Sequence, residues 1–412
     1  MNLRQVYDHN PESKVLTGHN LVYFAPGRWN ELWRDRHEIT SIFARQNKVL
    51  FVERRPHLRS TVAAFRQGEL EWSDLRDPSI RQISKNLFVF RYPAWAPKSG
   101  RFPLGWLTRA VRRLSIQNVL RKLQMSQPIV FFSRPSMVVD SVNEIPSARM
   151  LVYHIVDEYS GYGGQTLDGR RRVEEREREM MALVDVVMVV SKKLYDAKST
   201  FNANTYLVPN GVNYQAYTAA LADPRLPEDL QAIKGPRLGY SGLISSKVNL
   251  KMLRELAQEN PEWSLVFLGE VRVSEQAETW QTLLAMPNVH YLGLVEISQV
   301  PHYVKGFDVG LMPYVLNRQV ENSCPLKLYD YLAAGLPIAS VDILAAREFA
   351  PYVHLANSPQ DFGRAVWDAL ADTTPERRLA RRNIAAQNSW EARVEQMSEL
   401  IETQLTAKAS ES

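Results

Sequence analysis

The stretch Glu321–Ile338 (ENSCPLKLYDYLAAGLPI) holds the densest set of side chains that could do chemistry. Pro325 suits the first turn of a helix, and Gly335 suits its end. Asp330 then lies in mid-helix, where aspartate is a poor helix former, so we expect it to have a partner. A ribose diol is a good candidate because a carboxylate can accept two hydroxyl protons. The alternative is an ordinary exposed helical acid.

A second set of candidate residues follows a strand predicted in the second half. The glycine-containing run 239–242 (GYSG) precedes Ser245, Ser246 and Lys247, which we place at the start of a helix. Backbone amides beside small residues can approach an anion, and a helix N-terminus adds a partial positive charge. Lys247 would add a full charge, so the segment predicts a phosphate site. The alternative is a strand-to-helix turn with a solvated lysine.

The first half also carries polar residues where its predicted strands end. Gly27, Arg28 and Trp29 follow the first strand, and Asp157 follows a strand that contains His154. Ligands of open α/β sheets bind beyond the carboxyl ends of the strands, so these residues are candidates for binding a second ligand. A glycine turn, a buried structural histidine and a helix-capping acid are the alternative interpretations.

These candidates depend on strands that bring them to one edge of a sheet. Short runs rich in Val, Phe, Tyr and Ile are nearly continuous in apolarity, as in strands buried on both faces of a parallel sheet. The runs are residues 20–26, 48–53, 87–93, 128–134, 150–157, 186–191 and 205–209, then 237–242, 264–270, 289–295, 309–314, 337–341 and 353–356. Mixed segments, some with helical spacing, separate them. Two successive β/α series predict an α/β protein with two doubly wound domains.

The polar stretch 217–236 contains three prolines and no strand pattern, so it is the natural boundary between the domains. We expect an N-terminal extension at 1–18, a first domain at 19–216, a linker at 217–236, a second domain at 237–388, and a C-terminal helix and tail at 389–412. Apolar residues of the last segment fall on one helical stripe, so this helix either packs on its own domain or crosses back to the first. We expect the last six residues to be frayed.

The composition is that of a globular protein and excludes extensive disorder, since 45% of the 412 residues are hydrophobic and 23% are charged. A net charge of +5 over this length is weak evidence for a nucleic-acid partner, and we expect none. The single cysteine, Cys324, excludes an intramolecular disulfide and a multi-cysteine zinc site, and it fits a reducing compartment. We see no secretory signal and no membrane-spanning run, so we expect a soluble protein that at most sits on a membrane surface.

The segment 105–123 combines apolar and cationic residues at helical spacing. Its apolar positions are Leu107, Val111, Leu114 and Leu120, and its cations are Arg109, Arg112, Arg113, Arg121 and Lys122. The functional interpretation is contact with an anionic lipid surface, which the aromatic and proline-rich residues 95–106 would support. The alternative is an ordinary helix packed on the sheet with solvated cations.

Taken together, these motifs resemble a known enzyme family. The run PLKLYDYLAAGLPIAS (325–340) is similar to the signature of GT-B glycosyltransferases of the large retaining group called family 4. The segment 186–217 (VVMVVSKKLYDAKSTFNANTYLVPNGVNYQAY) resembles the end of that family's N-terminal domain, with its Pro-Asn-Gly-Val element. The opening (LVYFAPGRWNELWRDRHEITSIFARQNKVLFVE, 21–53) is similar to a bacterial branch that makes surface polysaccharides, such as teichuronic-acid-type sugar transferases. The resemblance covers residues 20–405.

The resemblance implies two Rossmann-like domains facing each other across a cleft, with the donor sugar nucleotide bound by the second and the acceptor by the first. The implied donor-binding residues are Gly242, Ser246, Lys247, Gly269, Glu270, Leu294, Val295, Leu326, Lys327 and Asp330. The implied catalytic residues are Asn322, Glu321, His154 and Asp157, and the acceptor-side residues are Gly27, Arg28 and Trp29. The family implies a nucleoside-diphosphate sugar as donor, a glycan or lipid-linked glycan as acceptor, retention of configuration, and no metal ion or other cofactor.

One position departs from the family pattern, which has two glutamates eight positions apart. Asp330 matches the second, but Asn322 stands where the first is expected, with Glu321 one place away. Either Asn322 contacts the sugar, or Glu321 takes that role, or another group does. A nucleotide-sugar epimerase of the same architecture and a catalytically silent glycan-binding or scaffold module are the alternatives. For the enzyme we expect a cytoplasmic location, or a peripheral one on the inner face of the cell membrane.

Overall fold

The first sheet has eight strands in the order β3-β4-β2-β1-β5-β6-β7-β8, and only β3 is antiparallel. In the computed structural model the chain is described for residues 14–54, 66, 80–93, 104–135, 141–161 and 166–411. The strands are β1 (Asn20–Phe24), β2 (Lys48–Val52), β3 (Ile80–Gln82), β4 (Leu87–Phe90), β5 (Ile129–Phe132), β6 (Met150–Ile155), β7 (Val186–Val189) and β8 (Thr205–Leu207). Chain order reverses between β1 and β5, which makes that junction the topological switch point of the sheet.

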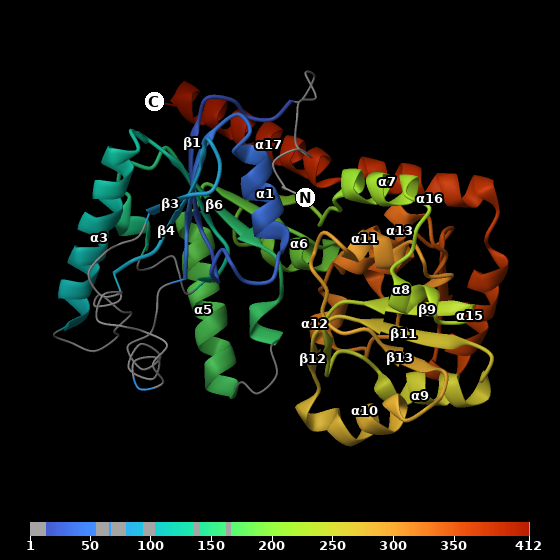
Figure 1. Cartoon of the computed structure of the whole chain (residues 1–412). Coiled ribbons are helices and arrows are strands. Elements are labelled where there is room, and N and C mark those ends of the chain that lie inside the picture. The colour runs from blue at the N-terminus through green and yellow to red at the C-terminus, as the bar shows by residue number, and fades with distance from the viewer. Residues whose placement is uncertain are drawn as a thin grey trace.

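The second sheet has six parallel strands in the order β13-β11-β9-β14-β15-β16. They are β9 (Arg237–Ser241), β11 (Ser264–Leu268), β13 (Val289–Tyr291), β14 (Val309–Met312), β15 (Ile338–Val341) and β16 (Val353–Ala356). The short strands β10 (Ile244–Ser245) and β12 (Val271–Arg272) pair beside it. We call the elements around the first sheet the N-terminal domain and those around the second the C-terminal domain; Figure 1 shows the two side by side.

Helices lie between the strands and cover the sheets. They are α1 (Asp35–Phe43), α3 (Leu104–Lys122), α5 (Leu167–Leu183), α6 (Lys192–Lys198), α7 (Tyr214–Ala222), α8 (Glu228–Gln231), α9 (Leu250–Glu259), α10 (Ala277–Leu284), α11 (Val300–Val304), α12 (Arg318–Glu321), α13 (Leu326–Ala334), α14 (Leu344–Arg347), α15 (Phe362–Ala371), α16 (Pro375–Gln387) and α17 (Trp390–Glu411). None of the described helices has both the length and the apolarity needed to cross a bilayer.

The strands are buried on both faces, which explains their unbroken apolar sequences. Along β1, Leu21 and Tyr23 point into one hydrophobic cluster, whereas Val22 and Phe24 point into another. Alternation of this kind follows from the two-residue period of a strand. The cluster that contains Val22 extends into the C-terminal domain, so a continuous apolar core joins the two sheets.

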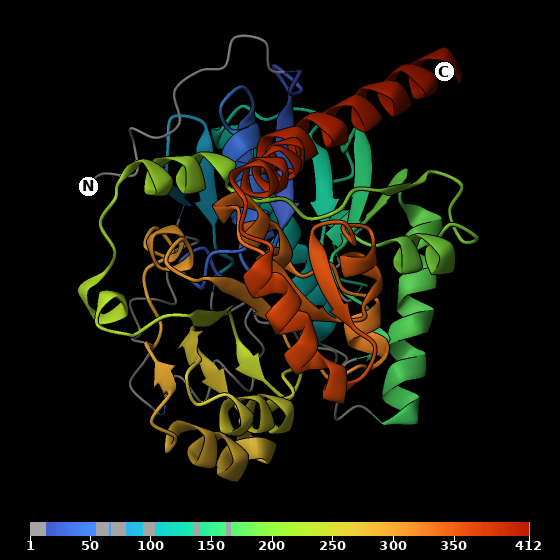
Figure 2. The same cartoon turned by 90° about the vertical axis from the view of Figure 1, so that its right-hand side faces the viewer.

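The C-terminal helix α17 packs on the N-terminal domain rather than on its own sheet. Its buried residues Trp390, Val394 and Met397 share a cluster with Leu21 of β1, and α17 contacts α1. Figures 1 and 2 show this helix running from the end of α16 over the first sheet. The chain thus crosses between the domains twice, once before β9 and once after α16.

The structure corrects three expectations about elements. Ser246 and Lys247 do not begin a helix: they follow β10, and α9 begins at Leu250 after the cap Asn249, whose side chain accepts from the Met252 amide. Five of the last six residues are helical rather than frayed, because α17 continues to Glu411. In addition, strands β3, β10 and β12 have no counterpart in the predicted runs.

The apolar positions noted in 105–123 divide between two faces of α3. Leu120 packs on the domain together with Ile116 and Val119, whereas Leu107 and Leu114 are exposed. Residues 95–103 of the preceding aromatic and proline-rich segment lie outside the described residues.

Candidate active site

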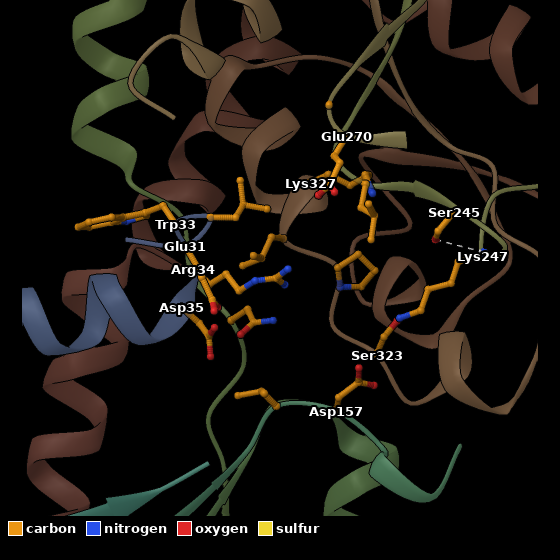
Figure 3. Close-up of a pocket in the computed structure, with 18 of the residues that line it drawn as sticks. Glu31, Trp33, Arg34, Asp35, Asp157, Ser245, Lys247, Glu270, Ser323 and Lys327 are labelled. Atoms are coloured by element: carbon orange, nitrogen blue, oxygen red, sulfur yellow. Dashed lines mark hydrogen bonds between the residues drawn. The ribbon is translucent and has the colours of Figure 1, made fainter. Parts of the chain in front are cut away.

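A cavity of about 800 Å³ opens between the carboxyl ends of the two sheets, and residues of both domains line it. Its walls come from the loops after β1, β5 and β6 on one side and after β9, β11 and β14 on the other. Figure 3 shows Arg34 and Asp157 from the N-terminal domain projecting toward Lys327 and Ser323 from the C-terminal domain. This is the position where open α/β sheets bind ligands.

Asp330 lines this cavity from helix α13. Pro325 caps the start of the helix, and Gly335 ends it with φ of 76°, a left-handed conformation that glycine adopts at low cost. Loss of water around the carboxylate raises its pKa from 3.8 to about 7, although the neighbouring Tyr217 hydroxyl and the Lys327 ammonium oppose the rise. Part of the side chain still faces the cavity, so a hydroxyl-bearing ligand can replace the missing water.

Lys327 lies one helical turn before Asp330 and also faces the cavity. Its Nζ donates hydrogen bonds to the hydroxyls of Tyr240 (3.1 Å) and Tyr314 (2.8 Å) and lies 4.3 Å from the Tyr240 ring centroid. Burial lowers the pKa of this lysine to about 7; Asp330 opposes the change and Lys247 adds to it. An anion entering the cavity would therefore favour protonation of Lys327.

Gly242 and Gly269 end β9 and β11 with φ of 131° and 137°, values that favour glycine. A Cβ on Gly269 would lie 2.2 Å from the Gly242 carbonyl oxygen, and one on Gly242 would lie 3.3 Å from Lys327 Nζ. Both glycines line the cavity. Because Gly242 and Gly269 have no side chains, their backbone and the Lys327 side chain can both contact a ligand in the cavity.

Other predicted donor-side residues have different environments. Lys247 lines the cavity together with Ser245, to whose Oγ the Lys247 amide lies at 3.5 Å, but Ser246 does not line it. Glu270 reaches the cavity while paired with Arg272 at 2.7 Å. Leu294, Val295 and Leu326 complete the part of this wall that the sequence predicted.

Asn322 and Glu321 do not line the cavity. Asn322 is buried, its side chain donates to the Arg318 carbonyl at 2.5 Å, and its own carbonyl accepts from Ser191 Oγ at 2.7 Å. Glu321 forms an ion pair with Lys193 of the N-terminal domain. Both residues therefore hold the two domains together in this conformation, while Gln319 and Ser323 from the same stretch face the cavity.

Of the two predicted catalytic residues of the N-terminal domain, only one lines the cavity. Asp157 lines the cavity and is oriented by the Glu158 amide, which donates to its Oδ1 at 3.0 Å. Beneath it, Glu158 accepts from Ser160 and lies 3.7 Å from Lys198, so the loop after β6 rests on buried charges. His154 is buried in β6 and does not line the cavity; desolvation lowers its pKa, and its Nδ1 has no hydrogen-bond partner.

Of the three acceptor-side candidates, only Gly27 lines the cavity. Arg28 is exposed to solvent outside it, and Trp29 belongs to the core, packed edge-on against Trp33 and Phe51. The position of a residue after a strand fixes its backbone but not the direction of its side chain. The sequence therefore could not show that Gly27 lines the cavity whereas Arg28 and Trp29 do not.

Most residues of this wall were missed, among them Tyr23, Asp35, Arg36 and Arg134. Asp35 and Arg36 begin α1, which follows the Gly27 turn; the acidic first turn of this helix was a detectable signal. Tyr23 lies in β1 and Arg134 follows β5, on either side of the switch point.

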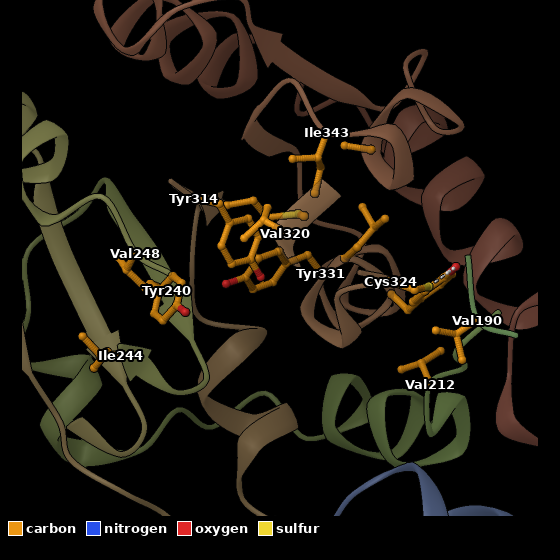
Figure 4. Packing of buried hydrophobic residues seen from close by; sticks show 14 of the residues in the cluster. Val190, Val212, Tyr240, Ile244, Val248, Tyr314, Val320, Cys324, Tyr331 and Ile343 are labelled. Atoms are coloured by element: carbon orange, nitrogen blue, oxygen red, sulfur yellow. Dashed lines mark hydrogen bonds between the residues drawn. The ribbon is translucent and has the colours of Figure 1, made fainter. Parts of the chain in front are cut away.

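Cys324 is 7% exposed at the meeting point of the domains. Its Sγ lies 3.4 Å from the Tyr329 hydroxyl, and Asn210 of the N-terminal domain donates to its carbonyl at 2.7 Å. Figure 4 shows it close to Val190 and Val212, which belong to the same hydrophobic cluster. Burial raises the pKa of the thiol, so it is not an activated nucleophile. Among the described residues, no group of three His, Cys, Asp or Glu side chains is arranged to hold a metal ion.

Comparison with known proteins finds similar sequences for part of the chain. Residues 237–372 match the family model described as glycosyl transferases group 1. The chain is 30% identical over 230 residues to the Bacillus subtilis (strain 168) protein "Putative teichuronic acid biosynthesis glycosyltransferase TuaH". This alignment covers 54% of the chain, and it spans only 57% of the relative.

Solved structures resemble the chain over nearly its whole length. Anabaena Alr3699/HepE in complex with UDP superposes with a TM-score of 0.61 at 14% identity, covering 94% of this chain and 100% of that one. Sucrose-phosphate synthase from Thermosynechococcus elongatus superposes with a TM-score of 0.66 at 15% identity, covering 95% and 100%. These similarities confirm the expected architecture of two Rossmann-like domains.

Proposed function

We propose that this protein, which has the GT-B fold and whose residues 237–372 match the family model described as glycosyl transferases group 1, transfers a sugar from a nucleoside-diphosphate sugar to an acceptor hydroxyl. The observation that carries the proposal is the wall formed by Asp330, Lys327 and the two strand-end glycines Gly242 and Gly269. It offers a carboxylate for a ribose diol beside a cation and exposed backbone for a diphosphate.

The departing diphosphate gains negative charge as the glycosidic bond breaks. We assign its stabilisation to Lys327 and Lys247, which both face the cavity from the donor wall. Lys327 would take up a proton as the diphosphate binds, because its pKa of about 7 leaves it partly neutral in the free protein. We propose that these groups act without a metal ion, and that Asp330 holds the ribose.

The acceptor would approach along the N-terminal wall, where Asp157 and Gly27 lie. The name of the Bacillus relative supports a bacterial cell-surface polysaccharide as the product, and we propose a glycan or lipid-linked glycan as acceptor. We also propose retention of the anomeric configuration, supported by the resemblance of residues 325–340 to retaining enzymes. NMR of the newly formed linkage tests retention, and an inverted product would contradict it.

A further part of the proposal concerns helix α3, which we expect to contact an anionic membrane surface. Trp106, Leu107 and Leu114 are 58%, 47% and 58% exposed on this helix. The exposed Arg109 and Arg113 accompany them, and the helix contains no acidic residue. Exposed apolar side chains among unopposed cations complement anionic lipid, and α3 lies on the outer side of the N-terminal domain, away from the second sheet (Figure 1). The protein would then act in the cytoplasm or on the inner face of the cell membrane.

Donor binding is tested by thermal shift with UDP, GDP, ADP, CMP and dTDP, with and without Mg²⁺. We expect one nucleoside diphosphate to stabilise the protein without metal, by about 2.7 kcal/mol at 100 times its dissociation constant. Asp330→Ala and Lys327→Met should abolish the shift, whereas Lys251→Met, an exposed lysine on α9, should retain it. No shift with any nucleotide would contradict the proposal. Nucleotide binding without sugar transfer to any acceptor would favour the silent module, and interconversion of sugar nucleotides would favour an epimerase.

Membrane contact is tested by co-sedimentation with vesicles of phosphatidylglycerol and phosphatidylcholine. We expect binding that rises with phosphatidylglycerol content and weakens with salt, and that is lost in Trp106→Ala combined with Arg113→Glu. Trp367→Ala is the matched control, because Trp367 is equally exposed, at 58%, on the other domain. Equal binding by the α3 variant and the wild type would rule out this surface.

A further inference from the structure

Arg36 is a buried cation whose neighbouring acids, Asp35 and Glu31, leave one of its donors open. It occupies the second position of α1, is 5% exposed and lines the cavity. Its Nε has no hydrogen-bond partner, and its ion pair with the half-exposed Glu31 spans 3.6 Å. Desolvation lowers the pKa of this guanidinium, although Asp35, Tyr23 and Glu31 oppose the change.

A buried guanidinium with open donor positions is costly for a folded protein. Its five N–H donors cannot be satisfied by deprotonation, because arginine keeps its proton in proteins. Removing a buried charge that lacks a good partner relieves its desolvation cost, whereas breaking a well-formed buried pair destabilises the fold. A side chain of this kind that faces a ligand-sized cavity is more simply explained by a ligand than by the fold.

Tyr23 presents a second donor in the same cavity. This residue of β1 is 2% exposed and lines the cavity, and its hydroxyl lies beside the Ser133 side chain without forming a hydrogen bond of good geometry. Burial raises its pKa far above the usual range, so the hydroxyl keeps its proton and can donate. Tyr23 and Arg36 thus both line the cavity, one from β1 and the other from the first turn of α1. They sit at the switch point between β1 and β5.

The surrounding wall gives this place further positive charge. Arg34, Arg54 and Arg134 line the same side of the cavity, against the acids Glu31, Asp35 and Asp157. Gly27 leaves room for the Glu31–Arg36 ion pair, since a Cβ there would lie 2.0 Å from Glu31 Oε2 and 3.1 Å from Arg36 Nη2. On the opposite wall Arg272 is already paired with Glu270, and Lys327 and Lys247 are assigned to the donor.

We propose that Arg36 and Tyr23 form an oxyanion subsite on the N-terminal wall, and that the acceptor presents a carboxylate or phosphate group to it. The inference rests on the proposed glycosyltransferase function and names the chemical class of its acceptor as an acidic glycan. A guanidinium edge binds a carboxylate or phosphate through two parallel hydrogen bonds, and the tyrosine hydroxyl adds a third. Asp35, which also lines the cavity, is available to accept hydroxyl protons from the same sugar.

The binding test uses pairs of sugars that differ in one charged group, with the stabilising nucleotide diphosphate present. Glucuronate is compared with glucose, galacturonate with galactose, and glucose 6-phosphate with glucose, by thermal shift and calorimetry. We expect acidic sugars to bind at least about tenfold tighter than their neutral counterparts. Preference for the uronates would indicate a carboxylate and preference for the sugar phosphate would indicate a phosphate. Equal behaviour of acidic and neutral sugars would overturn the proposal.

Substitutions distinguish binding at this subsite from a general effect of positive charge on the N-terminal domain. Arg36→Gln should abolish the preference for acidic sugars, Arg36→Lys should retain part of it, and Tyr23→Phe should weaken it. Arg28→Gln is the matched control, because Arg28 is an arginine of the same loop region that does not line the cavity. Survival of the full preference in Arg36→Gln, or its loss in Arg28→Gln, would contradict the assignment.

A ligand-free measurement separates a binding role from a structural one. If Arg36 serves a ligand, Arg36→Met should melt at or above the temperature of the wild type. A markedly lower melting temperature for Arg36→Met than for Arg28→Gln would show that the fold needs the charge, and would overturn the proposal. Failure of the proposed glycosyltransferase function would give a different result from failure of the subsite, because in that case no nucleoside diphosphate would stabilise the protein.

Discussion

Lys327 and Asp330 carry opposite charges at a place where burial makes each of them costly. Both have a pKa displaced to about 7, the lysine from above and the aspartate from below. Each shift reflects the free-energy cost of keeping a charged group buried. The charged forms of Lys327 and Asp330 therefore become more favourable when polar groups of a ligand replace the water that burial removes.

The first prediction concerns Asp330 and pH. Its folded-state pKa of about 7 exceeds the value of 3.8 without burial, so the folded protein binds the extra proton and loses stability as pH rises from about 4 to about 7. Asp330→Asn should therefore raise the free energy of unfolding of the ligand-free protein at pH 8 by about 1–2 kcal/mol, a value that allows for residual water in the cavity. At pH 4 the same substitution should change this free energy little. Melting curves at both pH values check this.

The exposed Asp368→Asn on α15 is the control for that measurement. The same Asp330→Asn protein should lose nucleotide stabilisation. A variant that is destabilised at pH 8 would mean that the ionised Asp330 supports the fold, contrary to our interpretation.

Single side chains were only partly predictable from the sequence. Asp330 and Lys327 both face the cavity: helical spacing singled out Asp330, and the family resemblance added Lys327. Tyr23 and Arg36 reach the same cavity from different elements, and Asn322 stays outside it because its side chain donates to the Arg318 carbonyl. The convergence of separate elements leaves no local pattern, so the sequence could not reveal it.

The two glycines at the ends of β9 and β11 place strict limits on how these strands leave the sheet. The Gly269 backbone approaches Gly242 so closely that no side chain fits, and both residues have φ beyond 130°. This close approach brings the donor wall near Lys327.

The second prediction compares glycines at different strand ends. Gly269→Ala should destabilise the protein by more than about 2 kcal/mol, because a Cβ would lie 2.2 Å from the Gly242 carbonyl oxygen in a strained conformation. Gly293→Ala is the control: its φ is 77° but nothing lies within 4 Å of a Cβ, so we expect about 1 kcal/mol. Urea unfolding of both variants measures the difference, and equal losses would contradict it.

Strands were the most predictable elements because burial on both faces gives long apolar runs, and all thirteen runs contain a strand. The start of α9 was misplaced because glycine and serine after β9 suggested a cap, whereas the cap is Asn249. Strands of two or three residues, such as β10 and β12, are too short to produce a period.

The two domains are joined by more than the linker between their sheets. Helix α17 returns to the N-terminal domain, and Ser191, Lys193 and Asn210 bind the segment 321–324. Because of these contacts, we expect unfolding of one domain to destabilise the other.

The third prediction tests that coupling. Trp390→Ala should cost about 3–5 kcal/mol, since Trp390 is buried against the first sheet, and it should lower the melting of the N-terminal domain as well as that of α17. Trp367→Ala, on the surface of α15, should cost less than about 1 kcal/mol. Scanning calorimetry gives both values; a Trp390 variant as stable as the Trp367 variant would show that α17 docks only loosely.

The position of Cys324 offers a way to watch the molecule open and close. It is the only cysteine in the sequence, and its thiol is covered where the N-terminal domain meets the segment 321–324. A thiol reagent should therefore react slowly with Cys324 in this conformation and faster when the domains part. The unmodified protein thus carries a built-in probe of this junction; because Cys324 also lines the cavity, slower reaction with a nucleotide bound would report both closure of the cleft and direct cover by the ligand.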